Sequence, residues 1–248
     1  MHKIFAKTLF LGKNVVFLPQ CHSTNGEAKT MSLSHGSVVW TDYQENGKGQ
    51  QGNVWLSEQG KNLLFTIYLK PDFLDPKDQY LLNLVSSLAI HKVVSANLPS
   101  TKVEIKWPND IYANDQKIAG ILAETVISKG KLEHLYCGIG LNVNQTHFNL
   151  PRATSMHQQA RSVFDRTDIL ETLLLEFESY YAKMKHDPDG LRNEYEKLLM
   201  WRDEIRNFEI GNERTSGILK GIDNNGRLII KFDAGVRSFN VKEIVFSY

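Results

Sequence analysis

The chain has 248 residues, enough for one large domain or for one large and one small domain. Apolar residues make up 42% and charged residues 23%, and 29 basic residues balance 28 acidic ones to a net charge of +1. This composition excludes extended disorder and gives no general attraction to a nucleic-acid backbone, so we expect no DNA partner.

The number of cysteines and the lengths of the apolar runs indicate where in the cell the protein is located. Cys21 and Cys137 are too few for a disulfide framework and fit a reducing compartment. No run of about 18 apolar residues is present, so no membrane span is expected. The first apolar run breaks at Gly12, which is too short for a signal peptide. We therefore expect a cytoplasmic protein with no membrane partner.

Short runs rich in Val, Ile and aromatic residues predict strands through the first half of the chain. The predicted strands are 15–18, 38–43, 63–69, 103–107, 111–112, 118–127 and 132–142. Asn114-Asp115 and residues 128–131 are typical of hairpin turns, so the middle of the chain is predicted to be antiparallel.

Apolar residues at helical spacing predict three longer helices, over 78–98, 167–185 and 191–201. The last of these follows an expected break at residues 187–190. A shorter helix is expected near Glu27, with Ser23 or Thr24 as its cap.

From about residue 207 the chain changes to short strands separated by tight turns. The strands are predicted at 208–210, 217–222, 227–232, 236–241 and 244–248. We expect an α+β domain over residues 1–206, with a mixed, mostly antiparallel sheet and helices packed on it, and a small β-barrel over residues 207–248.

Residues 47–52 form a glycine-rich loop that matches G-x-G-x-x-G. A dinucleotide-binding fingerprint needs a helix to open at the last glycine, and here a strand follows instead. The glycines and Lys48 would instead form a flexible loop that closes over an anion. A plain glycine-rich connection is the alternative.

Residues 106–110 place an ammonium group, an aromatic ring, an amide and a carboxylate at the end of one strand. Lys117 and Gly120 follow on the other arm of the hairpin. Lysines on both sides of a hairpin predict an anion clamp, and Asp110 or Asn109 offers oxygen ligands for Mg²⁺. The alternative is a solvated strand end.

Gly138 and Gly140 lie where side chains would block close approach to the sheet, with Asn142 two positions further on. A tight strand crossing would need the same glycines. Cys21 and His22 are adjacent, so their side chains point apart and do not form a nucleophile–base pair. The His and Cys residues show no zinc-ligand spacing.

Taken in order, these segments resemble biotin protein ligases. The matching segments are Ser23-Thr24-Asn25, Tyr43-Gln44, 47–52 followed by Trp55, 106–110, Lys117-Ile118-Ala119-Gly120 and 138–142. The resemblance implies a short form without an N-terminal DNA-binding domain and an SH3-like C-terminal domain. Over residues 145–203 only the helical character fits.

The resemblance implies a two-step reaction. Biotin and Mg·ATP give biotinyl-5′-AMP, and the biotinyl group then passes to a lysine of a biotin carboxyl carrier protein of the acetyl-CoA carboxylase type. It allows a homodimer. A lipoate–protein ligase-like enzyme and a non-catalytic binder of biotin or its adenylate are the alternatives.

The resemblance also assigns residues to roles. The catalytic cations are Lys117 and Lys106. The biotin-binding residues are Ser23, Thr24, Asn25, Gln44, Gly120 and Gly138. The adenylate-binding residues are Gly47, Lys48, Gly49, Gln50, Gln51, Gly52, Trp55, Asn109 and Asn142. The Mg²⁺ ligands are Asp110 or Asn142.

One departure from the family pattern concerns charge. The family loop usually carries more arginine, whereas Lys48, Gln50 and Gln51 occupy those positions here. The loop that should hold the adenylate is therefore less positive than usual.

Overall fold

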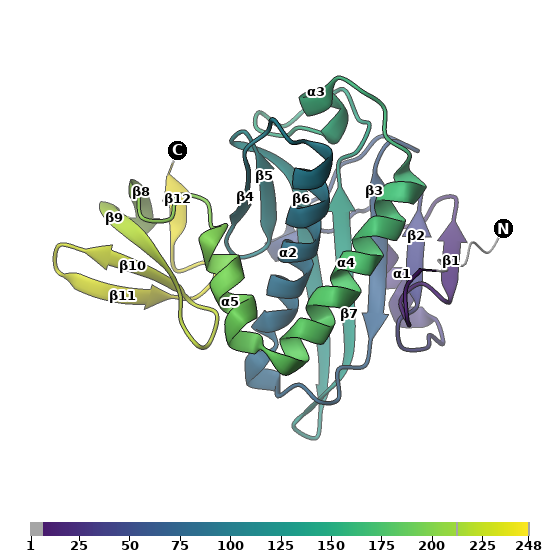
Figure 1. Ribbon diagram of the computed structural model, residues 1–248, viewed down its shortest axis with the longest axis horizontal. Coiled ribbons are helices and arrows are strands. Elements are labelled where there is room, and N and C mark those ends of the chain that lie inside the picture. Colours follow the sequence, from purple (N-terminus) through teal and green to yellow (C-terminus); the bar gives the residue numbers. More distant parts are fainter. Residues whose placement is uncertain (1–6, 212, 248) are drawn as a thin grey trace.

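A computed structural model of the chain describes residues 7–211 and 213–247, apart from the side chain of Gln51. These residues form two sheets (Figure 1). The larger sheet has seven strands in the order β1-β2-β3-β7-β6-β5-β4. Its strands are antiparallel except for the parallel pair β1 and β2, which confirms the predicted mixed, mostly antiparallel sheet.

The strands lie close to their predicted positions. In the larger sheet they are β1 (Val15–Leu18), β2 (Val38–Thr41), β3 (Leu63–Leu69), β4 (Val103–Lys106), β5 (Asp110–Ala113), β6 (Gln116–Ser128) and β7 (Lys131–Leu141). The α-helices are α1 (Thr24–Thr30), α2 (Tyr80–Asn97), α3 (Met156–Ala160), α4 (Arg166–His186) and α5 (Pro188–Lys197). Two short 3₁₀ helices, η1 (Gln50–Gly52) and η2 (Pro76–Asp78), complete this part.

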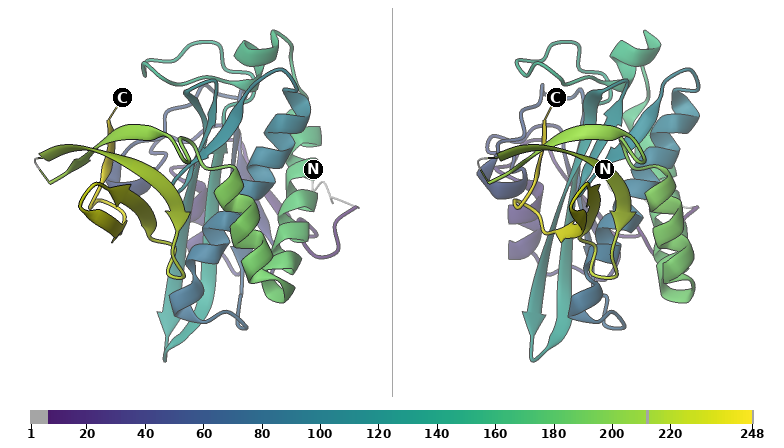
Figure 2. Two further views of the ribbon diagram at one scale, coloured as in Figure 1. Left: turned by 60° about the vertical axis from the view of Figure 1, so that its left-hand side comes forward. Right: turned by 90° about the vertical axis from the view of Figure 1, so that its left-hand side faces the viewer.

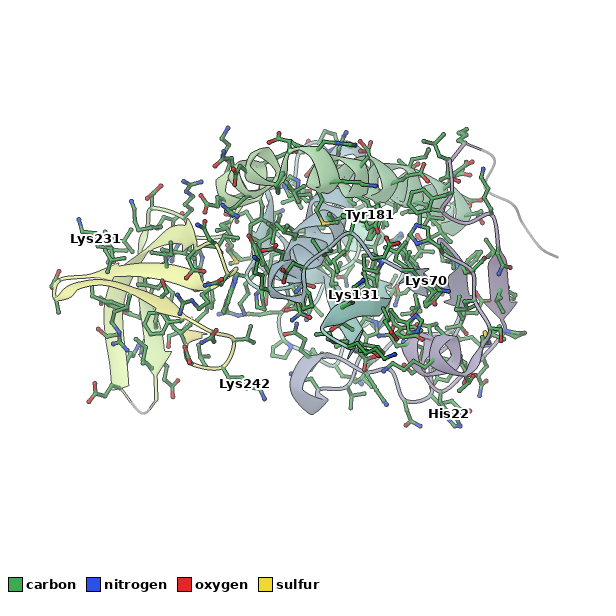
Figure 3. All side chains as sticks on the ribbon, turned by 90° about the horizontal axis from the view of Figure 1, so that it is seen from below. His22, Lys70, Lys131, Tyr181, Lys231 and Lys242 are labelled. Atoms are coloured by element: carbon green, nitrogen blue, oxygen red, sulfur yellow. The ribbon has the colours of Figure 1, made fainter. Side chains whose placement is uncertain are left out.

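The two faces of the larger sheet carry different layers. Helices α2 and α4 cover one face and α1 lies on the other (Figures 1 and 2). Figure 3 shows the same layers along the sheet, with Tyr181 of α4 on one side and His22 beside α1 on the other. Because side chains alternate along a strand, Cys137 meets Ser86 of α2, whereas Gly138 meets Asn25 of α1.

Apolar side chains of β3, α2 and α4 fill the space between the sheet and the helices. Phe65, Leu82 and Phe177 are fully buried there. Each such side chain contributes about 1.5–3 kcal/mol by leaving water. The opposite face also buries polar side chains, among them Asn25 of α1 and Thr66 of β3. No helix within residues 7–211 is long and apolar enough to cross a membrane.

Helix α5 begins earlier than predicted. Residues 187–190 were expected to separate two helices. Instead, Asp187 is the N-cap of α5, and its Oδ1 accepts a hydrogen bond of 2.9 Å from the Gly190 N–H. Pro188 is the first helical residue, where its missing N–H costs nothing. The helix ends at Lys197 rather than at residue 201.

The second sheet has five antiparallel strands in the order β11-β10-β9-β8-β12. They are β8 (Ile205–Ile210), β9 (Glu213–Ile222), β10 (Leu228–Phe232), β11 (Gly235–Phe239) and β12 (Val245–Ser247). Strand β8 starts at Ile205, two residues before residue 207, where the C-terminal domain was predicted to begin. In the described residues the outer strands β11 and β12 do not pair with each other, so the sheet is curved but is not closed by hydrogen bonds.

This small sheet packs beside the larger one (Figure 2). The Trp107 Nε1–H donates a hydrogen bond of 3.0 Å to the Gly226 carbonyl in the turn between β9 and β10. The segment at residues 106–110 is thereby joined to the C-terminal sheet.

Candidate active site

A cavity on the α1 face of the larger sheet gathers most of the predicted site residues. Those that line it are Ser23, Thr24, Asn25, Gln44, Lys48, Gly49, Gln50, Trp55, Asn109, Asp110, Lys117, Gly120 and Gly138. Its volume is about 50 Å³, several times the space that one water molecule needs.

Four further residues line the cavity without having been assigned a role from the sequence. They are Ile121, Leu122, Ile139 and Gly140. Gly140 carried a usable signal, because it lies two positions after Gly138 and so faces the same side of β7. The other three are apolar residues of β6 and β7 that a sequence cannot separate from ordinary core.

Several predicted residues lie outside this cavity. Lys106 is on the edge strand β4, and its Nζ lies 5.3 Å from the ring centroids of Tyr112 and Phe246, towards the C-terminal sheet. Asn142 is buried, and its Nδ2 donates a hydrogen bond of 2.9 Å to the Thr154 carbonyl. The structure therefore places Lys106 and Asn142 in supporting contacts rather than in the cavity.

The glycines of the loop at residues 47–52 differ in whether they line the cavity. Gly49 lines the cavity, whereas Gly47 and Gly52 do not. The Gly47 carbonyl accepts a hydrogen bond of 2.8 Å from the Trp55 N–H, and Gly52 has a φ of 84°, which favours glycine. These two residues shape the loop. The side chain of Gln51 lies outside the described part of the structure.

Trp55 lies on a pair of glycines in the sheet. Gly120 of β6 and Gly140 of β7 are cross-strand partners. A Cβ atom on Gly120 would lie 3.0 Å from Trp55 Cζ3, and one on Gly140 would lie 2.5 Å from Cε2. Only glycine at both positions lets the indole lie this close to the strands. Gly120, which was predicted to let a ligand approach the sheet, lines the cavity and also makes room for the Trp55 side chain.

Lys117 is held by two neighbours. Its Nζ lies 2.7 Å from Asp110 Oδ1 and 5.5 Å from the Trp55 ring centroid. A register shift between Ile111 and Tyr112 accompanies this pairing of β5 and β6. The ammonium group is thus oriented in the cavity and neutralised by one carboxylate, an arrangement that an incoming anion can replace.

Three of the residues predicted to bind biotin form hydrogen bonds within the protein. Gln44 Oε1 accepts a hydrogen bond of 2.8 Å from the Thr24 N–H. Asn25 Nδ2 donates to the Leu122 carbonyl at 3.1 Å and to Glu124 Oε2 at 2.7 Å. Among the described residues, the Ser23 hydroxyl and Gln44 Nε2 have no protein partner, so they remain for a ligand.

Glu124 is charged under ordinary conditions. Burial opposes ionisation of this carboxyl group, but the hydrogen bonds from Lys29 and Asn25 outweigh burial and lower its pKa. Lys29 Nζ lies 2.6 Å from Glu124 Oε1. Lys48 in the glycine-rich loop adds to the positive surroundings. The sequence had not indicated Glu124.

The residues present do not form an enclosed metal site. Within the described residues, no group of three or more His, Cys, Asp or Glu is placed to hold a metal ion. Asp110 is the one carboxylate among the cavity-lining residues, and Asn109 beside it donates its Nδ2–H to the Ile121 carbonyl at 2.6 Å. With a single carboxylate, a Mg²⁺ ion bound here would take most of its ligands from a phosphate-bearing substrate, and Asp110 would be the side chain available to it.

Two family models match the chain. The biotin/lipoate A/B protein ligase family matches residues 18–142, and the biotin protein ligase C terminal domain matches residues 207–247. The first match contains the cavity and the second contains most of the small sheet.

Relatives match over nearly the whole chain. The bifunctional ligase/repressor BirA of Bacillus subtilis is 28% identical over 96% of this chain and 75% of its own length. The biotin–[acetyl-CoA-carboxylase] ligase of Paracoccus denitrificans is 28% identical over 92% of this chain and 99% of its own. The biotin protein ligase of Aquifex aeolicus, solved with biotin and ATP, is 27% identical with a TM-score of 0.82, covering 95% of this chain and 100% of that one. The chain belongs to the biotin/lipoate A/B protein ligase family.

Proposed function

We propose that this protein is a biotin–[biotin carboxyl-carrier protein] ligase that uses ATP. The observation that carries the proposal is the layout of one cavity along β7. Asn25 and its hydrogen-bonding neighbours lie at Gly138, while Trp55 and Lys117 lie at the pair Gly120 and Gly140. These positions are two residues apart on the strand, or about 7 Å, so a polar ring and an anionic group can be held side by side.

In the first step a carboxylate oxygen of biotin attacks the α-phosphorus of ATP, and the bond to pyrophosphate breaks. Both reactants are anions, so a cation must lie between them. Lys117 is the best placed, because its ammonium group can exchange Asp110 for the reacting oxygens. Mg²⁺ bound to the phosphates would reduce their charge further, with Asp110 as the side chain available to it.

In the second step the ε-amine of a carrier lysine attacks the acyl carbon of biotinyl-5′-AMP, and AMP leaves. This step needs positioning more than a protein nucleophile. Cys21 and Cys137 agree with that, because burial raises the pKa of both thiols and keeps them protonated. The names of the acetyl-CoA-carboxylase ligases among the relatives support a carboxyl carrier protein as acceptor.

Biotin is favoured over lipoate by two features. The C-terminal sheet matches the biotin protein ligase C terminal domain. Ser23 and Gln44 line the cavity, and lipoate has no ureido ring to bind their polar groups.

The deciding experiment incubates the protein with Mg·ATP, a biotin carboxyl carrier domain, and either biotin or lipoate. We expect biotinylated carrier and biotin-dependent pyrophosphate release. Absence of both overturns the proposal, and labelling with lipoate alone replaces it with the lipoate ligase. The cytoplasmic location, the homodimer and the absence of DNA binding stay predictions.

A further inference from the structure

A second groove, of about 480 Å³, lies at the C-terminal end of α4 and shares no lining residue with the cavity described above. Four segments that are distant in the sequence form it: the stretch before β1, the loop before β2, the loop after β3 and the last residues of α4. Figure 3 labels a residue on each of the last two segments, Lys70 and Tyr181. A groove of this volume suits a small organic molecule.

Each of the four segments contributes an aromatic ring to the groove. The rings of Phe10 and His35 stack, with 4.8 Å between their centroids and 18° between their planes. Tyr181 contacts both rings, at centroid distances of 5.9 and 6.2 Å, and Phe73 meets Tyr181 edge-on at 5.6 Å. Phe73 is 38% exposed, so part of its ring is open to a ligand. Walls of this kind favour a ligand that itself has an aromatic ring.

The charges at the groove favour an anion. Lys185 Nζ lies 4.9 Å from the Phe73 ring centroid. Neither the ammonium group of Lys185 nor that of Lys70 forms an ion pair with any residue that the structure describes. Asp72 is the one carboxylate among the lining residues, so the lysines exceed the carboxylates by one. The excess positive charge attracts a ligand with a single negative charge.

Two uncharged groups at the groove offer protons. His35 Nδ1 accepts a hydrogen bond of 3.0 Å from the Lys70 backbone N–H. Burial lowers the pKa of His35, so its neutral ring carries its proton on Nε2. The Tyr181 side chain is buried, and its hydroxyl has no hydrogen-bond partner within residues 7–211 and 213–247. Burial, and after it the charge of Asp72, raise the pKa of that hydroxyl, so it stays a donor. Donors without a partner favour a ligand that brings acceptor oxygens.

We propose that this groove is a second binding site, which takes a small aromatic carboxylate. The ring of the ligand packs against Phe73 and Tyr181, and its carboxylate lies between the ammonium groups of Lys70 and Lys185. A carboxylate suits the groove better than a phosphate dianion, because the second charge of a phosphate would meet Asp72. The site does not depend on the proposed ligase activity, since none of its residues lines the other cavity.

The test measures the binding of 2-naphthoate to the whole chain by calorimetry, beside two matched probes. 2-Naphthylmethanol has the same rings without the charge, and cyclohexanecarboxylate has the charge without an aromatic ring. We expect 2-naphthoate to bind at a single site and about tenfold more tightly than either probe. Saturating biotin and ATP should leave its affinity unchanged, because they occupy the other cavity.

Variants of exposed residues assign the binding to this groove without disturbing the core. Lys70→Gln combined with Lys185→Gln should weaken 2-naphthoate about tenfold and leave 2-naphthylmethanol unchanged. Phe73→Leu should weaken both naphthalene probes, because it removes a ring that they contact. Lys131→Gln is the matched control, since Lys131 is an exposed lysine at the start of β7 that does not line the groove. It should bind every probe as the wild type does.

Three results would overturn the inference. The first is equal affinity for 2-naphthoate and 2-naphthylmethanol, or no binding of either, because the lysines then select no anion. The second is unchanged binding of 2-naphthoate in the double lysine variant. The third is displacement of 2-naphthoate by biotin, which would locate the probe in the cavity at Lys117. Failure of the ligase assay would leave this inference intact.

Discussion

Trp55 and Gly140 are matched to each other, since a Cβ atom at position 140 would lie 2.5 Å from the indole Cε2 atom. A Cβ atom at the facing residue, Gly120, would lie 3.0 Å from Cζ3 of the same ring. The tryptophan therefore depends on two glycines in neighbouring strands. Its ring in turn lies beneath Lys117, whose Nζ is 5.5 Å from the centroid. Displacing the ring would disturb the cation that we assign to the first step.

The first prediction follows from this contact. Gly140→Ala should push the indole away from the sheet and slow adenylate formation on the order of 10²-fold, because small misplacements at a reacting centre are costly. Biotin-dependent pyrophosphate release measures the effect. Gly26→Ala is the control, since its Cβ would meet only Ser23 Cβ at 3.8 Å. Equal rates for the two variants would show that Trp55 has no part in the step.

The second prediction concerns Lys117. Lys117→Ala should reduce adenylate formation on the order of 10²–10³-fold, because it removes charge stabilisation from a site with little water. Lys92→Ala is the matched control, since Lys92 pairs with Glu176 at 2.8 Å between α2 and α4, outside the cavity. If both variants release pyrophosphate equally fast, Lys117 is only a surface lysine.

The fold was largely predictable where a strand is buried. The run 63–69 was predicted to the residue as β3, because seven consecutive apolar or β-branched residues fit only a buried strand. Helix α5 was misplaced because Asp, Pro and Gly are typical of turns and also of helix starts. Only the packing of the helix onto the core decides between the two.

The site was predictable in its motifs but not in its supporting contacts. Lys106 and Lys117 flank the same hairpin and are equivalent in the sequence. What separates them is Phe246, about 140 positions away, whose ring holds the Lys106 ammonium beside the C-terminal sheet. Thr66 and Glu124 lie outside every motif, and they reach Asn25 only through the registers of β3, β6 and β7.

The third prediction concerns stability. The Glu178 carboxylate on α4 accepts hydrogen bonds from the backbone N–H groups of Leu9, Phe10 and Leu11, at 2.6, 2.7 and 3.0 Å. Glu178→Leu should lower the free energy of unfolding by about 3–5 kcal/mol, because the three partly buried N–H groups would lose their hydrogen-bond acceptor. Urea denaturation measures the loss. Glu171→Ala breaks only the exposed pair with Lys7 and should cost under about 1 kcal/mol. Similar losses of stability in both variants would contradict the prediction that Glu178 holds residues 9–11 against α4.

The fourth prediction is a pH dependence. Burial opposes ionisation of Glu194, but hydrogen bonds from Lys183 and Tyr180 outweigh it and lower its pKa below the ordinary 4.5. The folded chain then binds fewer protons here than the unfolded chain, so the free energy of unfolding rises with pH. The contribution is complete above about pH 4.5 and is lost as the pH falls through the folded pKa.

Urea denaturation in steps from about pH 6 to about pH 3.5 tests this assignment. Glu194→Gln should be less stable than the wild type at the higher pH, and the difference should narrow as the pH falls. Glu133→Gln changes an exposed carboxyl group on β7 and should show no such narrowing. A difference for Glu194→Gln that stays constant with pH would contradict the assignment.

The last prediction concerns Gln50, which lines the cavity at a position where the resemblance to biotin protein ligases implies a cation. The cavity has two lysines, and one of them, Lys117, is already neutralised by Asp110. An arginine at position 50 could form a charge-assisted hydrogen bond to the adenylate, worth about 1.5–3 kcal/mol. We therefore expect Gln50→Arg to slow the release of biotinyl-5′-AMP about tenfold, since about 1.4 kcal/mol is a factor of ten.

Release is measured by stopped-flow mixing of the preformed adenylate complex with excess unlabelled biotin. Because free adenylate acylates lysines without selection, biotin and ATP without carrier should label the wild-type chain more than Gln50→Arg. Gln50→Glu is the charge-reversed control and should release the adenylate faster, since it adds a negative charge beside the phosphate. If Gln50→Arg releases the adenylate as fast as the wild type, Lys48 already supplies the missing charge, and the loop's lower positive charge has no consequence for retention.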